Sequence, residues 1–294
     1  MSGQSWLAEA LEQLEAYYWA PGGPAEKSQE EMRRLGAGGW QPALAIFYAH
    51  YAFERAGAPR SWGPLAGSIV EDFPKDSNFA DLPELAWNEF TSRVDKPNRK
   101  TNPLAVGASK MPATEFVGEL SKDRHNIISW AARMTGHGEA SVASGKLRSL
   151  QGIGPKIAAF FLRDVVTSYG VSESALDDRA CILPIDVWLS RGIAELVGRP
   201  DLVNESRDAQ TSDAAIAWAD SHKLRIATLD AGLWVLGARF ARSVPRMVAA
   251  LKDRSAFEML VNDELQQAES SVTALRKLEE TVRAGSASRL SEPL

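Results

Sequence analysis

The sequence has very few of the residues that bind metals or form disulfides. It contains one cysteine, Cys181, and four histidines that are scattered along the chain. A single cysteine forbids an internal disulfide, and the cysteine and histidines do not have the spacing of a zinc or iron–sulfur site. We therefore expect no metal cofactor and no iron–sulfur cluster.

Long apolar runs and a surplus of positive charge are also missing. No stretch approaches the roughly 20 apolar residues that cross a bilayer, and the first 20 residues read as an amphipathic helix rather than a signal peptide. We expect a cytoplasmic protein with no membrane partner. The chain carries 33 Lys and Arg against 38 Asp and Glu, a net charge of -5. Any affinity for nucleic acid must therefore come from local groups.

Apolar residues recur at helical spacing in short segments that Gly and Pro separate. With 294 residues, 45% of them hydrophobic, the chain is long enough for one or two domains. It shows no convincing series of alternating strand patterns, so the predicted fold is mostly α. Helices are predicted over residues 6–19, 42–56, 113–134, 142–150, 155–169, 187–197, 211–222, 229–242 and 255–283.

The stretch 62–110 is rich in Pro, Gly, Asn and Asp, which predicts a loop-rich connection between two helical lobes. It contains a basic run formed by Arg93, Lys96, Arg99 and Lys100. This run could contact phosphates, but a solvated basic loop is the favoured interpretation.

Residues 147–163, LRSLQGIGPKIAAFFLR, predict two helices joined by a tight turn. Gly152 and Gly154 bracket Ile153, and glycine lets a backbone turn sharply and approach another chain closely. Pro155 suits the first turn of the second helix, where its missing N–H costs little. The pattern is that of a helix-hairpin-helix. A tight turn inside a helical core is the alternative interpretation.

The start of the second helix of this hairpin has the features of an anion site. Its exposed backbone N–H groups and the positive end of the helix dipole can hold a phosphate oxygen. Lys146, Arg148 and Lys156 add the positive charge that the chain as a whole lacks. We interpret the hairpin as a contact to the DNA backbone that does not depend on base sequence.

A second informative segment, LPIDVWLSR at 183–191, places Asp186 directly before an apolar helical stretch. Asp is a preferred residue at the N-cap of a helix, so Asp186 should cap this one. Taken alone, an Asp in this position is interpreted as a cap and nothing more.

Together the two segments resemble the helix-hairpin-helix-GPD superfamily of base-excision DNA glycosylases, whose pattern is L-x-G-[VI]-G-x-K-x-A followed by [VI]-D-x-x-x-x-R. The resemblance covers about residues 113–242. It implies a two-lobed helical glycosylase fold and an enzyme that flips a base out of double-stranded DNA and cuts its bond to the sugar. The matching residues are Leu150, Gly152, Ile153, Gly154, Lys156 and Ala158 in the first half, and Ile185, Asp186 and Arg191 in the second.

In this superfamily a lysine at the hairpin position marks the branch that also cleaves the strand, the 8-oxoguanine glycosylases and endonuclease III. This resemblance implies that Lys156 is the nucleophile. The continuation FFLRD resembles archaeal and bacterial 8-oxoguanine glycosylases, and LDAGLWVLGARF at 229–240 resembles the late helix that closes the catalytic cleft. The cysteine-rich loop of endonuclease III is absent, which disfavours that subfamily.

The chain also departs from the family pattern. Gln151 replaces the common hairpin proline, the connection from Lys156 to Asp186 is longer than in most members, and residues 1–110 match no family domain. The sequence therefore does not fix the identity of the excised base, and an oxidised purine such as 8-oxoguanine is the first choice. One alternative is a glycosylase that removes glucosylated hydroxymethylcytosine from phage DNA as antiviral defence. Another is a non-catalytic DNA-binding module, against which the joint presence of Lys156 and Asp186 argues.

Asp186 and Lys156 would have different roles in the reaction. Positive charge builds on the sugar as the base leaves, and an ionised Asp186 would stabilise it. Lys156 would attack C1′ and form a Schiff base, which requires an amine that is neutral part of the time, a state that burial or the helix start would favour. A flipped base also needs an aromatic or apolar pocket. The weak candidates, each favoured as a core residue, are Phe160, Phe161, Trp188, Trp234 and Phe240.

These features predict three regions: an N-terminal helical and loop-rich region of unassigned role over 1–110, a catalytic core over 111–250, and a C-terminal helix over 251–294 whose tail frays from Gly285. We expect a monomer that acts on the nucleoid of a bacterial or archaeal cytoplasm.

Overall fold

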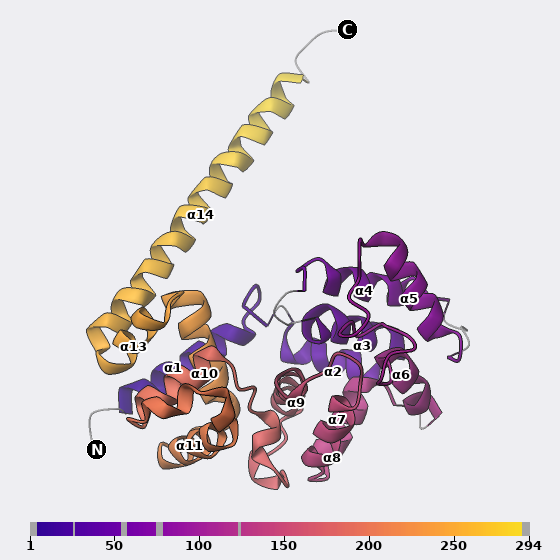
Figure 1. The fold of residues 1–294 in the computed structure, drawn as a ribbon. Helices are drawn as coiled ribbons and strands as arrows, with labels where there is room; N and C mark the ends of the chain where they lie inside the picture. The colour runs from indigo at the N-terminus through magenta and orange to yellow at the C-terminus, as the bar shows by residue number, and fades with distance from the viewer. Residues whose placement is uncertain (1–4, 26, 54–57, 75–78, 123–124, 290–294) are drawn as a thin grey trace. The chain divides into compact units, whose positions relative to one another are not determined.

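The computed structural model describes residues 5–25, 27–53, 58–74, 79–122 and 125–289. Over these residues the chain forms 14 α-helices and no β-sheet, which confirms the predicted mostly helical fold (Figure 1). The chain divides into two compact units, residues 1–233 and 234–294. In the described part, no helix combines the length and apolar character needed to cross a membrane.

The first unit contains the helices α1 to α12, apart from Trp234 at the end of α12, and short loops and 3-10 turns join them. The α-helices are α1 (Ser5–Trp19), α2 (Gln29–Ala37), α3 (Trp40–Phe47), α4 (Trp62–Glu71), α5 (Leu82–Arg93), α6 (Ala113–Lys122), α7 (Ile127–Gly136), α8 (Ala140–Arg148), α9 (Pro155–Tyr169), α10 (Val187–Leu196), α11 (Asp208–Ser221) and α12 (Ile226–Trp234). A π-helical turn, η1 (Tyr48–Ala52), follows α3, and the 3-10 turns are η2 (Glu173–Ala175), η3 (Arg179–Ile182), η4 (Pro200–Val203) and η5 (Glu205–Arg207).

One hydrophobic core joins α2 to α9, and α9 lies at its centre. Apolar residues occur all round α9, as expected for a helix that is buried on most of its faces. Phe161 of α9 is fully buried and packs edge-on against Phe47, with 5.1 Å between ring centroids. The helix begins at Pro155 and ends at Gly170, whose φ of 63° is left-handed, so the predicted bounds 155–169 are confirmed.

A second set of buried contacts joins α1 to α12. A Cβ atom on Gly232 would lie 2.8 Å from Leu11 Cδ2, so glycine is what allows the two helices to approach this closely. Glu15 of α1 accepts hydrogen bonds from the hydroxyl of Thr228 (2.6 Å) and from the guanidinium of Arg225 (2.5 Å). These contacts anchor the N-terminal helix beside the segment that contains Asp230.

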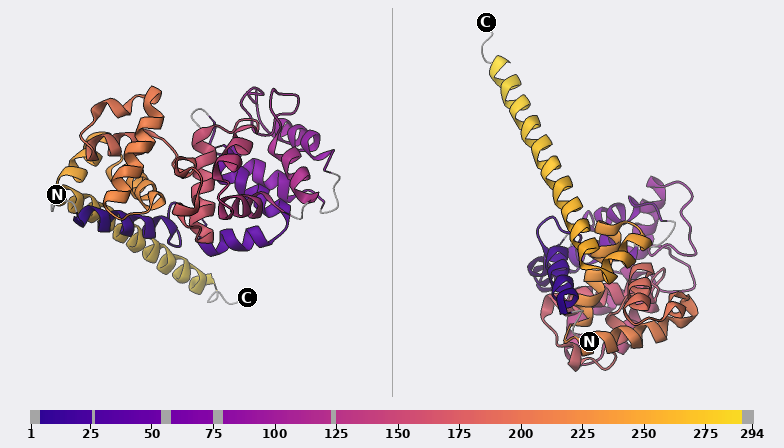
Figure 2. Two further views of the ribbon diagram at one scale, coloured as in Figure 1. Left: turned by 90° about the horizontal axis from the view of Figure 1, so that it is seen from below. Right: turned by 90° about the vertical axis from the view of Figure 1, so that its left-hand side faces the viewer.

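The second unit contains the π-helical segment η6 (Val235–Ala241), α13 (Val244–Lys252) and α14 (Arg254–Arg289). The first turns of α14 pack on α13, while residues 265–277 are exposed. Figure 2 shows α14 as one continuous helix. It is helical to Arg289, further than the frayed tail expected from Gly285, and residues 290–294 lie outside the described residues.

The structure corrects the sequence analysis in the stretch 62–110, which is not only a loop. It contains α4 and α5, which bury Ile69 and Phe90 in the core. The short helices α2 and α13 are not predicted either. Each of these four helices is too short for its apolar spacing to be recognised in the sequence. Packing of a few apolar side chains stabilises it in the folded protein.

The predicted helix 113–134 is in fact two helices, because Asn126 interrupts it. The Asn126 side chain accepts hydrogen bonds from the N–H groups of Ile128 and Ser129 and so caps α7. Its amide also donates to the carbonyl of Leu35 (3.0 Å), which ties the cap to α2. The predicted helices 42–56 and 229–242 likewise change into the π-helical segments η1 and η6 after α3 and α12, and residues 54–57 lie outside the described residues.

Candidate functional site

The predicted hairpin consists of α8, a turn over residues 149–154, and α9. Gly152 in the turn has a φ of +73°, in the left-handed region that favours glycine. A Cβ atom there would lie 2.5 Å from the carbonyl oxygen of Thr101. Glycine is therefore needed at position 152 for two reasons: it allows the left-handed turn, and it leaves room for the chain before α6 to pack against the hairpin. Ile153, between the two glycines, is buried in the core.

The other glycine of the hairpin faces open space. Gly154 is the N-cap of α9 in extended conformation, and a Cβ atom there would meet nothing within 4 Å. Glycine has no side chain to cap the helix, and Pro155 has no N–H. The N–H groups of Lys156 and Ile157 lie in the first turn, where no carbonyl of the same helix can accept them. This open end has the geometry that binds anions.

The two glycines should respond differently to alanine. Gly152→Ala should lower the free energy of unfolding by roughly 2 kcal/mol or more, because it combines a left-handed backbone with a backbone clash. Gly154→Ala should change it by no more than about 1 kcal/mol, since the site is open, its φ is negative, and only the preference for glycine over alanine at an N-cap is lost. Urea unfolding followed by circular dichroism measures both, and equal losses would contradict this assignment.

Lys156 is exposed, so the burial that would favour its neutral form is not observed in the free protein. Its position in α9 is nevertheless informative, because Phe160 and Arg163 follow it at spacings of four and seven residues and so share its face of the helix. Phe160 is half-buried and packs against Tyr51 (5.2 Å between centroids). The guanidinium carbon of Arg163 lies 4.6 Å from the centroid of the Phe160 ring.

Arg163 is the centre of a buried polar cluster that the sequence analysis did not identify. Its guanidinium donates to Asp164 (2.8 and 2.7 Å) and to the hydroxyl of Tyr18 (2.7 Å), and it pairs with Asp230 of α12. The Tyr51 hydroxyl donates to Asp164 (3.0 Å). The signal was present in the sequence as adjacent opposite charges within the apolar run FFLRDVV. Two charges in such a run are stable only if they are paired inside the core.

The cluster has more negative than positive groups. One guanidinium faces two buried carboxylates, so it cannot fully compensate both. Burial raises the pKa of Asp230 to about 7, against the opposing effect of Arg163, and the negative charge of Asp186 raises it further. Burial also raises the pKa of Asp164. The predicted catalytic carboxylate, Asp186, is thus one of the charges that act on Asp230.

Asp186 caps α10, as predicted. Its Oδ1 accepts hydrogen bonds from the N–H groups of Trp188 and Leu189, both at 2.9 Å. The residue is half-buried. Because both bonds go to Oδ1, the other oxygen, Oδ2, has no part in the cap. Asp186 can therefore act on a ligand without releasing the helix.

The raised pKa of Asp230 predicts how stability depends on pH. Between about pH 4 and pH 7 the folded protein holds a proton on Asp230 that the unfolded chain has released, so stability should fall as pH rises through this window. The fall should be measurable, since one unit of pKa corresponds to about 1.4 kcal/mol. Asp230→Asn should flatten it, as urea unfolding at pH 4.5, 6 and 7.5 would show. Asp220→Asn, at an exposed carboxylate, should leave the slope intact, and an unchanged slope in both variants would contradict the assignment.

The aromatic candidates have different surroundings. Phe161 is a core residue, as favoured. Trp188 is half-buried at the second position of α10, next to the Asp186 cap. Trp234 and Phe240 belong to the second unit, and their role as pocket residues stays a prediction.

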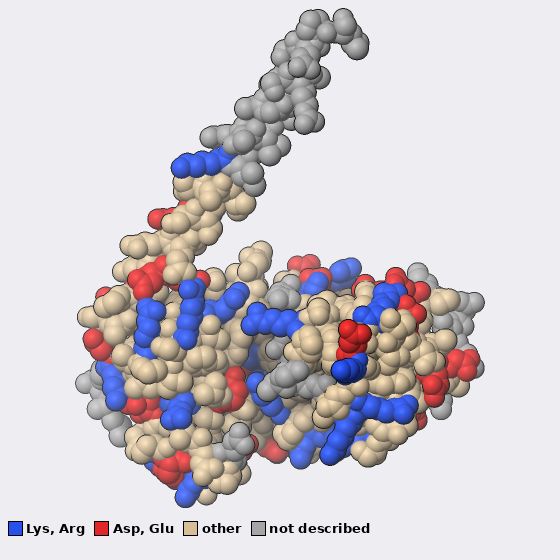
Figure 3. Space-filling view, turned by 45° about the horizontal axis from the view of Figure 1, so that its top comes forward, with Lys and Arg blue, Asp and Glu red and all other residues tan. Residues whose placement is uncertain are grey.

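Of the basic candidates beside the hairpin, Lys146 pairs with Glu119 at 3.1 Å, whereas Arg148 is exposed at the end of α8. Acidic and basic side chains are interspersed over the face shown in Figure 3. In the described residues, no group of three or more His, Cys, Asp or Glu side chains is arranged to hold a metal ion.

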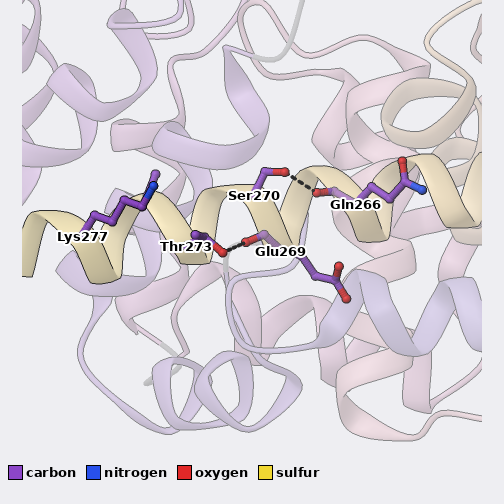
Figure 4. Close-up of a pocket in the computed structure, with 6 residues that line it drawn as sticks. Gln266, Glu269, Ser270, Thr273 and Lys277 are labelled. Carbon is purple, nitrogen blue, oxygen red and sulfur yellow. Dashed lines mark hydrogen bonds between the residues drawn. The ribbon is translucent and has the colours of Figure 1, made fainter.

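A shallow pocket on α14 offers no converging groups. Its lining residues all come from this one helix (Figure 4). The hydroxyls of Ser270 and Thr273 donate to the helix's own carbonyls at Gln266 (2.8 Å) and Glu269 (2.9 Å). Hydroxyls that are bonded back to their own helix do not form a binding site, so we assign none here.

Comparison with known proteins identifies no relative of this chain. No protein family matches its sequence, and no curated protein and no solved structure matches it either. The arrangement of the chain's own residues must carry the functional argument.

Proposed function

We propose that this protein is a DNA glycosylase that excises a modified base from double-stranded DNA, with an oxidised purine such as 8-oxoguanine as the favoured substrate, and that Lys156 gives it AP-lyase activity. One observation carries the proposal. Lys156 and Asp186 are 30 residues apart in the sequence, yet they lie at the starts of α9 and α10 and are both linked to the cluster around Arg163. Lys156 shares a helix face with Arg163, and Asp186 acts electrostatically on the partner of Arg163, Asp230.

Asp186 and Lys156 have different roles in the proposed reaction. When the bond between C1′ and the base nitrogen breaks, its electron pair leaves with the base and positive charge develops on the sugar. The carboxylate of Asp186 stabilises that charge. The amine of Lys156 forms a bond to C1′ and gives up a proton, which Asp186 can accept. The C1′–O4′ bond then breaks, O4′ takes the proton that Asp186 accepted, and a Schiff base forms at C1′. Loss of a proton from C2′ breaks the C3′–O bond and expels the 3′-phosphate.

The hairpin supports the proposal through binding. A phosphate oxygen at the open end of α9 would accept hydrogen bonds from its first N–H groups. Bound DNA would also cover Lys156, which is exposed in the free protein, and remove water from around its amine. A module that only binds the DNA backbone has no need of Asp186 or of its charge beside Asp230, so the enzyme is the favoured interpretation.

Borohydride trapping on defined duplexes tests the proposal. The purified protein is incubated with labelled duplexes that contain 8-oxoguanine, uracil or glucosylated hydroxymethylcytosine, and with an unmodified duplex as control. A covalent adduct on the 8-oxoguanine duplex supports the proposal as stated. An adduct on the glucosylated duplex alone supports the antiviral alternative, and base release without an adduct means that water, not Lys156, attacks. Release of no base from any duplex would contradict the enzyme.

A further inference from the structure

The chain between α5 and α6 packs directly against the hairpin. The side-chain amide of Gln151 donates to the carbonyl of Lys100 (2.5 Å), and the Gln151 N–H donates to the carbonyl of Met111 (2.7 Å). The ammonium of Lys110 donates to the carbonyl of Arg148 (2.6 Å), at the end of α8. These contacts hold residues 99–111 against one side of the hairpin turn. The other side of the turn, at Gly154, is open.

This segment is anchored in the core, so its position does not depend on a ligand. Asn102 is fully buried, and its Oδ1 accepts a hydrogen bond from the N–H of Leu104 (2.9 Å). Leu104 and Ala105 are also fully buried in the core. The basic side chains at both ends of the anchor, in contrast, are exposed.

The structure divides the basic run that the sequence presents as one loop. Arg93 belongs to α5 and forms an ion pair with Glu89 of the same helix. Arg99 instead lies over the ring of the buried Trp87, 5.7 Å from its centroid, and among the described residues no carboxylate pairs with it. Lys100 follows it and is exposed. The interpretation as a solvated loop is therefore wrong for Arg93, which is helical and paired, and Arg99 and Lys100 need a separate interpretation.

Several exposed cations of this surface have no ion-pair partner among the described residues. Among the described residues, no carboxylate forms an ion pair with five exposed cations here, Arg99, Lys100, Lys110, Arg148 and Lys156. Cations elsewhere commonly do have such partners, as in Arg179 with Asp220, Arg199 with Asp201, Arg242 with Glu264 and Arg246 with Asp263. In a chain of net charge -5, a group of unpaired cations beside an open helix start fits an external polyanion.

We propose that these five cations and the open end of α9 form one continuous surface, the clamp surface, that binds the phosphate backbone of double-stranded DNA. The inference deepens the proposed function and rests on it for the identity of the ligand. Each phosphate that a Lys or Arg neutralises releases counterions, so binding should weaken with salt in proportion to the number of contacts. Residues 99–111 would thus extend the hairpin contact without reading any base.

Fluorescence anisotropy with a labelled duplex that contains a stable tetrahydrofuran abasic site tests the clamp surface. The affinity is measured between 50 and 200 mM salt for the full chain and for the variant Arg99→Gln/Lys100→Gln. If both residues contact phosphates, the slope of log K against log salt should become less steep by about 1.8, and the affinity should fall roughly 60-fold at 0.1 M salt. Arg93→Gln and Arg246→Gln, whose charges are paired within the protein, should leave the slope unchanged.

The outcomes separate this inference from the proposed enzyme. A variant that keeps its thermal midpoint but shows the reduced slope supports the clamp surface. An unchanged slope overturns it, whereas the enzyme is judged by base release and borohydride trapping. A reduced slope in a protein that releases no base from any duplex would keep the clamp surface and overturn the glycosylase. Wild-type protein that shows no salt-dependent binding would overturn the clamp surface outright.

Discussion

Lys156→Gln should abolish borohydride trapping and slow base release by about 10³-fold or more, because no other amine would be placed to attack C1′. The fold should tolerate the change. Lys156 is exposed in the first turn of α9, where glutamine is also a good helix former. The thermal midpoint should therefore move by no more than about 2 °C. Single-turnover release from the duplex that traps wild-type protein measures the effect, and an adduct that survives in the variant would exclude Lys156 as the nucleophile.

A matched change at Asp186 separates its charge from its structural role. Asn caps a helix about as well as Asp, so Asp186→Asn should keep α10 and remove only the negative charge. We expect base release to slow by about 10²- to 10³-fold. Asp186→Ala should lose the charge and the cap together, at a further cost of about 1 kcal/mol in stability. Wild-type rates in Asp186→Asn would leave the residue as a cap and nothing more.

Local signals account for the elements that sequence analysis placed correctly. Pro155 at the start of α9 and Gly170 at its end are conformational signals that act within one or two residues, so both bounds of the helix are readable. The same holds for the Asp186 cap. The helices α4 and α5 lie in a stretch whose Pro, Gly and Asn content indicates a loop. They are helical because Ile69 and Phe90 pack into a core that forms only in the folded chain.

The parts of the site that could not be predicted are those made by distant residues. Arg163 pairs with Asp230 across 67 positions, and Gln151 reaches Lys100 across 51. Neither partner can be chosen from local pattern. Gln151 is a clear case, because the sequence gives no evident reason why glutamine stands where the pattern that the hairpin resembles has a proline. In the structure its amide and backbone hold residues 99–111 against the hairpin.

Replacing the centre of the buried cluster should cost more stability than any other change considered for this protein. Arg163→Met would leave Asp164 and Asp230 buried without a cation and remove the donor to Tyr18. Breaking a buried pair in this way typically costs about 3–5 kcal/mol. Urea unfolding at pH 7.5 should show a loss in this range.

Arg254→Met is the matched control, because Arg254 and its ion-pair partner Glu258 are both exposed, and it should lose no more than about 1 kcal/mol. Equal losses in the two variants would contradict the central role of Arg163. Adding Asp230→Asn to Arg163→Met should restore part of the stability, since it removes one unpaired carboxylate. If that double variant folds yet releases base as slowly as Asp186→Asn, then the cluster also positions Asp186. A near-normal rate would mean that the cluster stabilises the fold alone.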